Sequence, residues 1–144
     1  TSVEENSSSI QKAKEVLKSN NIKNVELFAQ DTLRYLKSIK KKFDIIILDP
    51  PRKGCTQEVL DEVLRHLKSN HSKAESDEIL RSAQNDAIAE GASKGKIIYV
   101  SCNPATLARD LKYLTEHGAK VESIQPFDMF CHTYHIENVA IINL

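Results

Sequence analysis

The sequence predicts an α/β fold built on a doubly wound, mostly parallel sheet, and three observations lead to this prediction. Short apolar stretches alternate with stretches of helical periodicity along most of the 144 residues. One of them, FDIIIL at 43–48, is almost continuously apolar, as a strand is when both faces of its sheet are covered. Several apolar stretches are followed at once by Asp, Glu or Cys, and sheets of this class carry their sites at the carboxyl ends of the strands.

The helices follow from periodicity and capping residues. Apolar side chains recur three or four positions apart in four segments, at 10–20, 32–42, 56–67 and 104–117. Ser7 to Ser9 offer N-caps to the first helix, and Asn20 with Asn21 ends it. Gly118 follows the last helix and suits a C′ position.

The strands are the short apolar runs between these helices. They are expected at 1–3, 25–28, 43–48, 97–100, 120–124 and 136–142. Strands that alternate with helices pair in parallel, so the first four belong to a parallel arrangement. The last two strands have no helix between them, which predicts one antiparallel strand.

The segment 69–93 differs from the rest of the chain. It is polar, holds no aromatic residue, and shows only a weak helical pattern near 79–88. We expect it to be a surface insertion, helical or disordered, within one domain that spans 1–144.

Composition limits the classes of protein that remain. The chain has 20 basic and 20 acidic residues and a pI near 6.9, so no global positive field favours nucleic acid, and any RNA contact is expected to be local. Three cysteines without C-x-x-C spacing argue against a disulfide framework or a zinc site, and they suit a reducing, cytoplasmic location with no metal. No apolar run approaches the ~20 residues of a membrane span, and TSVEENSSS at the start does not resemble a signal peptide.

The most informative segment is YVSCNPATLARDL, from Tyr99 to Leu111. It predicts a buried strand that ends near Cys102, with a helix starting at once. Backbone N–H groups and the helix dipole stabilise a thiolate at such a point, which is where nucleophilic cysteines are found. A small apolar side chain at a strand end is an equally good interpretation of this segment taken alone.

Four residues whose side chains could bind a ligand or react fall at predicted strand ends, namely Glu4, Asp31, Asp49 and Cys102. Because the carboxyl ends of parallel strands share one edge of the sheet, their coincidence indicates a site more strongly than any one of them does.

Three blocks of sequence carry a resemblance to a known family. They are DPPRKGC at Asp49–Cys55, YVSCNPATLARDL at Tyr99–Leu111, and FDMFCHTYHIENVA at Phe127–Ala140, and a weaker fourth joins Val3-Glu4 to the stretch 21–25. In this order and spacing the blocks resemble the methyltransferase domain of the S-adenosylmethionine-dependent RNA 5-methyluridine (uracil-C5) methyltransferases of rRNA and tRNA. The resemblance covers most of the chain outside 69–93.

The resemblance implies a covalent mechanism and assigns two catalytic residues. Uracil C5 is too weak a nucleophile to take a methyl group until a thiolate has added at C6, and a base must then remove the C5 proton. The family's nucleophilic cysteine corresponds to Cys102, and the glutamate of its H-x-E motif corresponds to Glu137, two residues after His135. Without the resemblance, Glu137 reads as a solvated charge at a strand end.

The same resemblance implies binding roles for other residues. Glu4 is expected to bond the ribose hydroxyls of S-adenosylmethionine, with Glu5 as the alternative if the register shifts by one, and Asp31 to lie near the adenine. For Asp31 the role of a helix N-cap remains equally open. Asp49 is expected between cofactor and target base, and Arg52 is a candidate contact for RNA phosphate, although basic loop residues are usually only solvated.

Other residues of the same blocks are not expected in the chemistry. Arg109 and Asp110 are expected to be structural, and Cys55 and Cys131 to be core or loop thiols.

The chain also departs from the family pattern. The family places a cofactor-binding strand and glycine-rich turn just before the position of Thr1, whereas the four glycines here form no G-x-G. That strand normally lies between those expected at 1–3 and 43–48, so its absence would expose backbone groups on two strands. The chain is therefore expected to be a C-terminal part of the domain, whose partners include the missing N-terminal segments. Cys131 also replaces a usual proline, so the loop around it is expected to be looser.

Two other interpretations stay open beside the enzyme. One is a decayed or regulatory fragment that keeps Cys102 and Glu137 but holds no cofactor alone. The other is an amino-group methyltransferase, whose D-P-P loop usually continues with an aromatic residue. Here Arg52 follows the prolines, and such enzymes need no cysteine nucleophile.

Overall fold

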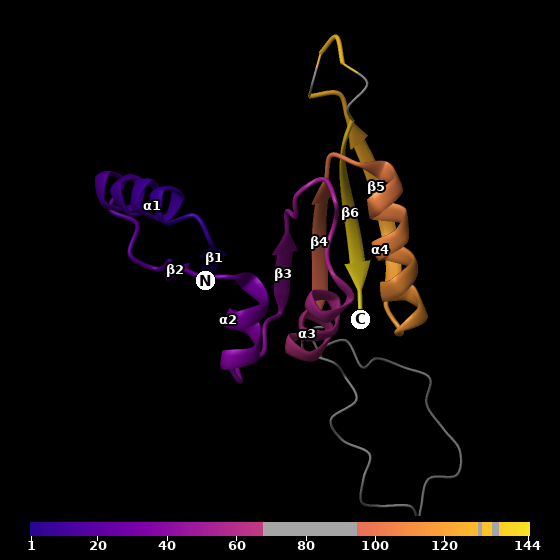
Figure 1. The fold of residues 1–144 in the computed structure, drawn as a ribbon, viewed down its shortest axis with the longest axis horizontal. Helices are drawn as coiled ribbons and strands as arrows, with labels where there is room; N and C mark the ends of the chain where they lie inside the picture. The colour runs from indigo at the N-terminus through magenta and orange to yellow at the C-terminus, as the bar shows by residue number, and fades with distance from the viewer. Residues whose placement is uncertain (68–94, 130, 134–135) are drawn as a thin grey trace, which may run out of the picture.

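The computed structural model describes residues 1–67, 95–129, 131–133 and 136–144, and it confirms the α/β class (Figure 1). The elements in chain order are β1 (Ser2–Glu4), α1 (Ser7–Ser19), β2 (Leu27–Ala29), α2 (Thr32–Ser38), β3 (Ile45–Leu48), α3 (Gln57–His66), β4 (Lys96–Ser101), α4 (Pro104–Glu116), β5 (Lys120–Phe127) and β6 (Glu137–Asn143). The insertion expected at 69–93 lies outside the described residues.

The strands form two sheets rather than one. β1 and β2 make a parallel two-stranded sheet, and a four-stranded sheet has the order β3-β4-β6-β5. β3 and β4 are parallel, whereas β6 lies antiparallel to both of its neighbours. The antiparallel strand was predicted from the missing helix between β5 and β6.

Two helix boundaries differ from the prediction, and both have local causes. Asn6, and not a serine of 7–9, caps α1, because its side-chain oxygen accepts from the amides of Ser8 and Ser9. The second helix ends at Ser38 instead of continuing to residue 42. There the chain turns extended at Ile39 and bonds to the end of α3, through the Phe43 amide and the His66 carbonyl.

The core lies on one face of the four-stranded sheet, which we call the helix face because α3 and α4 pack on it (Figure 1). Alternate residues of β4 and β6, namely Ile97, Tyr99, Ala140 and Ile142, are fully buried there. Leucines and a valine of α3 and α4, together with the residue that caps the end of α3, complete it, and these are Leu60, Val63, Leu107, Leu111, Leu114 and the cap Leu67.

The opposite face is more exposed, and we call it the open face. Ile45 and Ile47 of β3 point to it and are 54% and 67% exposed, whereas Leu48 on the helix face is buried. Their β4 partners on this face, Lys96 and Ile98, are only half-buried. An almost continuously apolar strand of this kind is normally covered on both faces.

Within the described residues, β3 pairs only with β4, and β1 pairs only with β2. The edge of β3 that faces away from β4 therefore makes no ladder in this part of the chain. Among the described residues, the backbone groups of this edge are therefore available for pairing.

A buried histidine ties the end of α3 to the end of α2. The two ring nitrogens of His66 lie 2.7 Å from the Lys41 carbonyl and 2.8 Å from the Leu36 carbonyl. Each ring nitrogen thus lies within hydrogen-bond distance of a backbone carbonyl. The Glu62 carboxylate, also buried, lies 3.7 Å from the ring.

Replacing His66 with alanine is expected to lower the free energy of unfolding by about 3 kcal/mol, because it removes both ring–carbonyl bonds and the ring that lies beside the buried Glu62 carboxylate. Urea unfolding measures this loss. His117→Ala is the matched control, since the exposed His117 makes a single ring–carbonyl bond to Tyr113, and it should cost about 1 kcal/mol or less. Equal losses in the two variants would contradict the interpretation.

Candidate functional site

Three of the residues singled out in the sequence lie at one edge of the four-stranded sheet. Asp49 directly follows β3, Cys102 directly follows β4, and Glu137 begins β6. In the ladder, Leu48 is paired with Tyr99 and Ser101 with Asn138. One further step of the same register brings Cys102 opposite Glu137, and Asp49 opposite Val100, two residues before Cys102.

This register also decides on which side of the sheet the three residues lie. Paired residues share a face, and neighbours along a strand alternate. Leu48, Ser101 and Asn138 are buried on the helix face. Asp49, Cys102 and Glu137 therefore belong to the open face, where Asp49 is exposed and the other two are half-buried.

The backbone after Cys102 is arranged as the sequence predicted. Asn103 caps α4 by accepting from the Ala105 amide, and Pro104 occupies the first turn. The Ser101 hydroxyl accepts from the Asn103 amide and donates to its carbonyl, which tightens the turn. Cys102 thus lies two residues before the first residue of the 13-residue helix α4.

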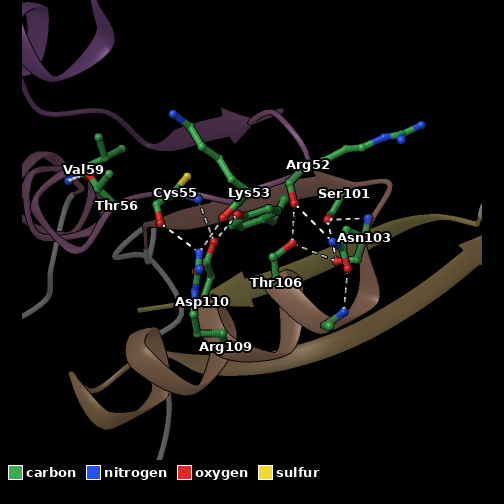
Figure 2. A network of polar contacts seen from close by, with 12 residues as sticks. Arg52, Lys53, Cys55, Thr56, Val59, Ser101, Asn103, Thr106, Arg109 and Asp110 are labelled. Carbon is green, nitrogen blue, oxygen red and sulfur yellow. Dashed lines mark hydrogen bonds and ion pairs between the residues drawn. The ribbon is translucent and has the colours of Figure 1, made fainter.

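The segment 49–55, which we call the β3 loop, is bound to the first turn of α4 (Figure 2). The Arg52 carbonyl accepts from the side-chain Nδ2 of Asn103 at 3.2 Å and from the Thr106 hydroxyl at 3.1 Å. The loop that carries Asp49 and the helix that follows Cys102 are thereby joined next to both residues.

A second set of contacts joins the same loop to the middle of α4 (Figure 2). Arg109 donates to the carbonyls of Lys53 and Cys55, and the Asp110 carboxylate accepts from the Cys55 amide at 2.8 Å. Asp110 also accepts from the Tyr99 hydroxyl at 2.5 Å. Burial and this donation to Asp110 raise the pKa of Tyr99, so its hydroxyl remains a donor.

Gly54 has a role that the sequence reasoning missed. Its φ is +75°, and its amide closes a turn onto the Pro51 carbonyl at 2.8 Å. A Cβ at this position would lie 2.5 Å from Asp110 Oδ2 and 2.6 Å from Arg109 Nη2. Only glycine permits this approach of loop to helix. A Pro-rich turn that ends in glycine after a buried strand was the available signal.

The two other predicted cofactor residues lie on the two-stranded sheet. Glu4 ends β1, and its carboxylate accepts from the Asn6 amide at 2.8 Å. Asp31 follows β2 and caps α2 by accepting from the Arg34 amide at 2.8 Å. Of the two roles left open for Asp31, N-capping is therefore observed.

The predicted cofactor set fits its group in charge and position. Glu4, Asp31 and Asp49 are exposed carboxylates at the carboxyl ends of three strands. Carboxylates accept from the hydroxyl and amino groups of a nucleoside, and their negative charge complements a sulfonium. The described residues form no group of three or more His, Cys, Asp and Glu placed to hold a metal ion.

A cleft of about 600 Å³ lies elsewhere, between the β3 loop, the start of α3 and the outer side of α4. Its lining includes Lys53, Cys55, Arg109 and Asp110, but none of Asp49, Cys102 and Glu137. Because it opens on the helix side of the loop, it is separate from the strand-edge site.

No helix among the residues described in the structure is long and apolar enough to cross a membrane.

Cys55 and Cys131 differ in environment, as expected of a packed and a loop thiol. Burial raises the pKa of Cys55 above its ordinary 9.0, the Tyr99 hydroxyl opposes this, and the Asp110 carboxylate adds to it. Cys131 is exposed. Alkylation by iodoacetamide, followed by mass spectrometry, should therefore modify Cys131 before Cys55, and the rate at Cys55 should still rise with pH above 9.0. Earlier modification of Cys55 would contradict this assignment.

Comparison with solved structures defines the class of fold. A methyltransferase of Pyrococcus furiosus superposes with a TM-score of 0.65 at 17% identity, over 98% of this chain and 60% of its own. A Streptococcus mutans methyltransferase, solved in complex with SAH, gives 0.58 at 15% identity, over 99% and 74%. The chain has the Rossmann-like fold of methyltransferases.

Sequence comparison identifies the family within that class. A family model described as tRNA (Uracil-5-)-methyltransferase matches residues 83–143. An RNA methyltransferase of Thermotoga maritima is 38% identical over 123 residues, which are 85% of this chain and 22% of that protein. One of Bacillus cereus is 41% identical over 101 residues, 70% of this chain and 16% of that protein. Over most of its length the chain is similar to these RNA methyltransferases, and it spans about a fifth of their length.

Proposed function

We propose that the chain is the catalytic part of an S-adenosylmethionine-dependent RNA methyltransferase that acts on C5 of a uridine in rRNA or tRNA. The observation that supports the proposal is the ladder of β4 and β6, whose last pair, Ser101 with Asn138, directly adjoins the predicted nucleophile Cys102 and the predicted base Glu137. The family match and the methyltransferase fold support the reaction class.

In the proposed mechanism the Cys102 thiolate adds to C6 of the uracil and forms a carbon–sulfur bond. The electrons displaced onto the ring make C5 nucleophilic, and C5 then accepts a methyl group. Glu137 takes the C5 proton, and the carbon–sulfur bond breaks to release the thiolate and 5-methyluridine. Bound S-adenosylmethionine supplies the methyl group as an electrophile.

The remaining residues hold the reactants. Glu4 and Asp31 are proposed to bind the ribose and adenine of the cofactor, although each already accepts one backbone amide. Asp49, at the carboxyl end of β3, is proposed to lie between cofactor and uracil. Arg52, exposed in the β3 loop, is proposed to contact RNA phosphate, which would position the RNA without reading its sequence.

Covalent trapping tests the proposal. The protein is a chimera in which this chain replaces the matching 123 residues of the Thermotoga maritima relative. With S-adenosylmethionine and a 5-fluorouridine RNA, the last proton abstraction is blocked, so a denaturation-resistant protein–RNA adduct is expected. Cys102→Ala should abolish it and Cys131→Ser should not. No adduct from the chimera, or an adduct that persists in Cys102→Ala, would overturn the mechanism.

The second candidate, a fragment that does not bind cofactor alone, is favoured by the exposed isoleucines of β3 and by its outer edge, which pairs with no strand among the described residues. The two candidates differ in whether the chain acts alone. The parent protein is proposed to be cytoplasmic.

A further inference from the structure

The contacts between the β3 loop and α4 involve the loop's backbone. The carbonyls of Arg52, Lys53 and Cys55 and the amide of Cys55 are all bonded to side chains of α4 (Figure 2). Backbone contacts of this kind fix where the loop lies.

Asp110 is the buried centre of these contacts, and its side chain is only 2% exposed. One oxygen accepts from the Tyr99 hydroxyl and the Cys55 amide, and the other accepts from Arg109 Nε at 2.8 Å. A buried carboxylate is stable only when its oxygens are saturated with donors. Moving the loop would remove the Cys55 donor, so the cost of leaving this oxygen undersatisfied resists displacement of the loop.

We propose that Asp110 is a positioning residue, which holds the β3 loop on α4 and thereby fixes Asp49 relative to Cys102. The loop begins at Asp49, and α4 begins two residues after Cys102. The contact therefore joins the loop that contains Asp49 to the helix that follows Cys102. The effect on the reaction rests on the proposed function, whereas the effect on the loop does not.

The chain contains a matched control for this role. Asp61 of α3 also accepts from a tyrosine hydroxyl, that of Tyr113 on α4, at 2.6 Å. This pair is exposed, and Asp61 has no contact with the β3 loop among the bonds described. Asp61→Asn therefore removes the charge of an aspartate that binds a tyrosine hydroxyl, without touching the loop. Asp110→Asn removes the same kind of charge but also puts an amide N–H₂ among donors that need an acceptor.

The first measurement is independent of catalysis. Spin labels are attached to Cys102 and to a cysteine introduced by Asp49→Cys, in this chain with Cys55→Ser and Cys131→Ser. Electron paramagnetic resonance should report one narrow distance distribution, unchanged by Asp61→Asn and broadened by Asp110→Asn. If Asp110→Asn does not fold, Arg109→Ala replaces it. That side chain is 57% exposed, and its loss removes the bonds to the Lys53 and Cys55 carbonyls together with the ion pair to Asp110.

The second measurement is the rate of 5-fluorouridine adduct formation by the chimera at saturating RNA. Asp110→Asn should slow it about tenfold or more, since misplaced reacting groups lose rate steeply, and Asp61→Asn should not. An unchanged distance distribution would overturn the proposal whatever the reaction does. A broadened distribution with an unchanged rate would also overturn it, because Asp110 would then be structural only. A chimera that forms no adduct, but whose loop broadens in Asp110→Asn, would refute the proposed function and leave the positioning of the loop supported.

Discussion

Replacement of Glu137 by glutamine is expected to lower methyl transfer by the chimera on the order of a thousandfold, because the amide cannot take the C5 proton. The steps before proton removal remain possible. A covalent protein–RNA complex that carries the new methyl group should therefore accumulate on an ordinary uridine RNA, without fluorine. Gel electrophoresis under denaturing conditions and mass spectrometry of the digested complex measure both effects.

Glu122→Gln is the control for this substitution. Glu122 is an exposed carboxylate of β5 that accepts from Asn143 and Lys96, at the end of the sheet away from Cys102. These bonds, that to Asn143 first, lower the pKa of Glu122, but nothing in the proposed reaction uses it. Loss of turnover in Glu137→Gln without accumulation of the methylated complex would remove Glu137 from the role of base.

The chain alone is expected to show no methyl transfer and weak or no binding of S-adenosylmethionine, whereas the chimera is expected to show both. The physical reason lies in β3, whose outer edge is unpaired within the described residues and whose Ile45 and Ile47 are 54% and 67% exposed. The glycine-rich turn that the family resemblance implies for the cofactor is also absent from these 144 residues. Calorimetric titration of cofactor and transfer of a labelled methyl group measure the two quantities.

In the chimera, Cys102→Ala separates cofactor binding from methyl transfer, since this variant should bind cofactor without transferring the methyl group. Detectable turnover by the chain alone would contradict the expectation of an incomplete site. Cofactor binding by neither protein would argue against Glu4, Asp31 and Asp49 as its ligands.

Local signals in the sequence were sufficient for the α/β class, the helices and the antiparallel strand. These features depend on periodicity and on caps within a few residues, which is why Asp31 was recognised as a candidate cap. The same locality explains the errors. The end of α2 is decided by His66, which binds the Leu36 and Lys41 carbonyls from a helix about 25 residues further on.

The candidate site likewise combines features that local sequence predicted with features that depend on contacts between distant segments. Sequence by itself predicted Cys102 from its place before a helix, and Glu137 only through the family resemblance. Only the tertiary structure decided that the end of β4 pairs with the start of β6, at Ser101 and Asn138 next to these two residues, because strand register depends on pairing between distant segments. It also decided the role of Asp110 and the need for Gly54, since a buried carboxylate requires donors that here come from three separate segments of the chain.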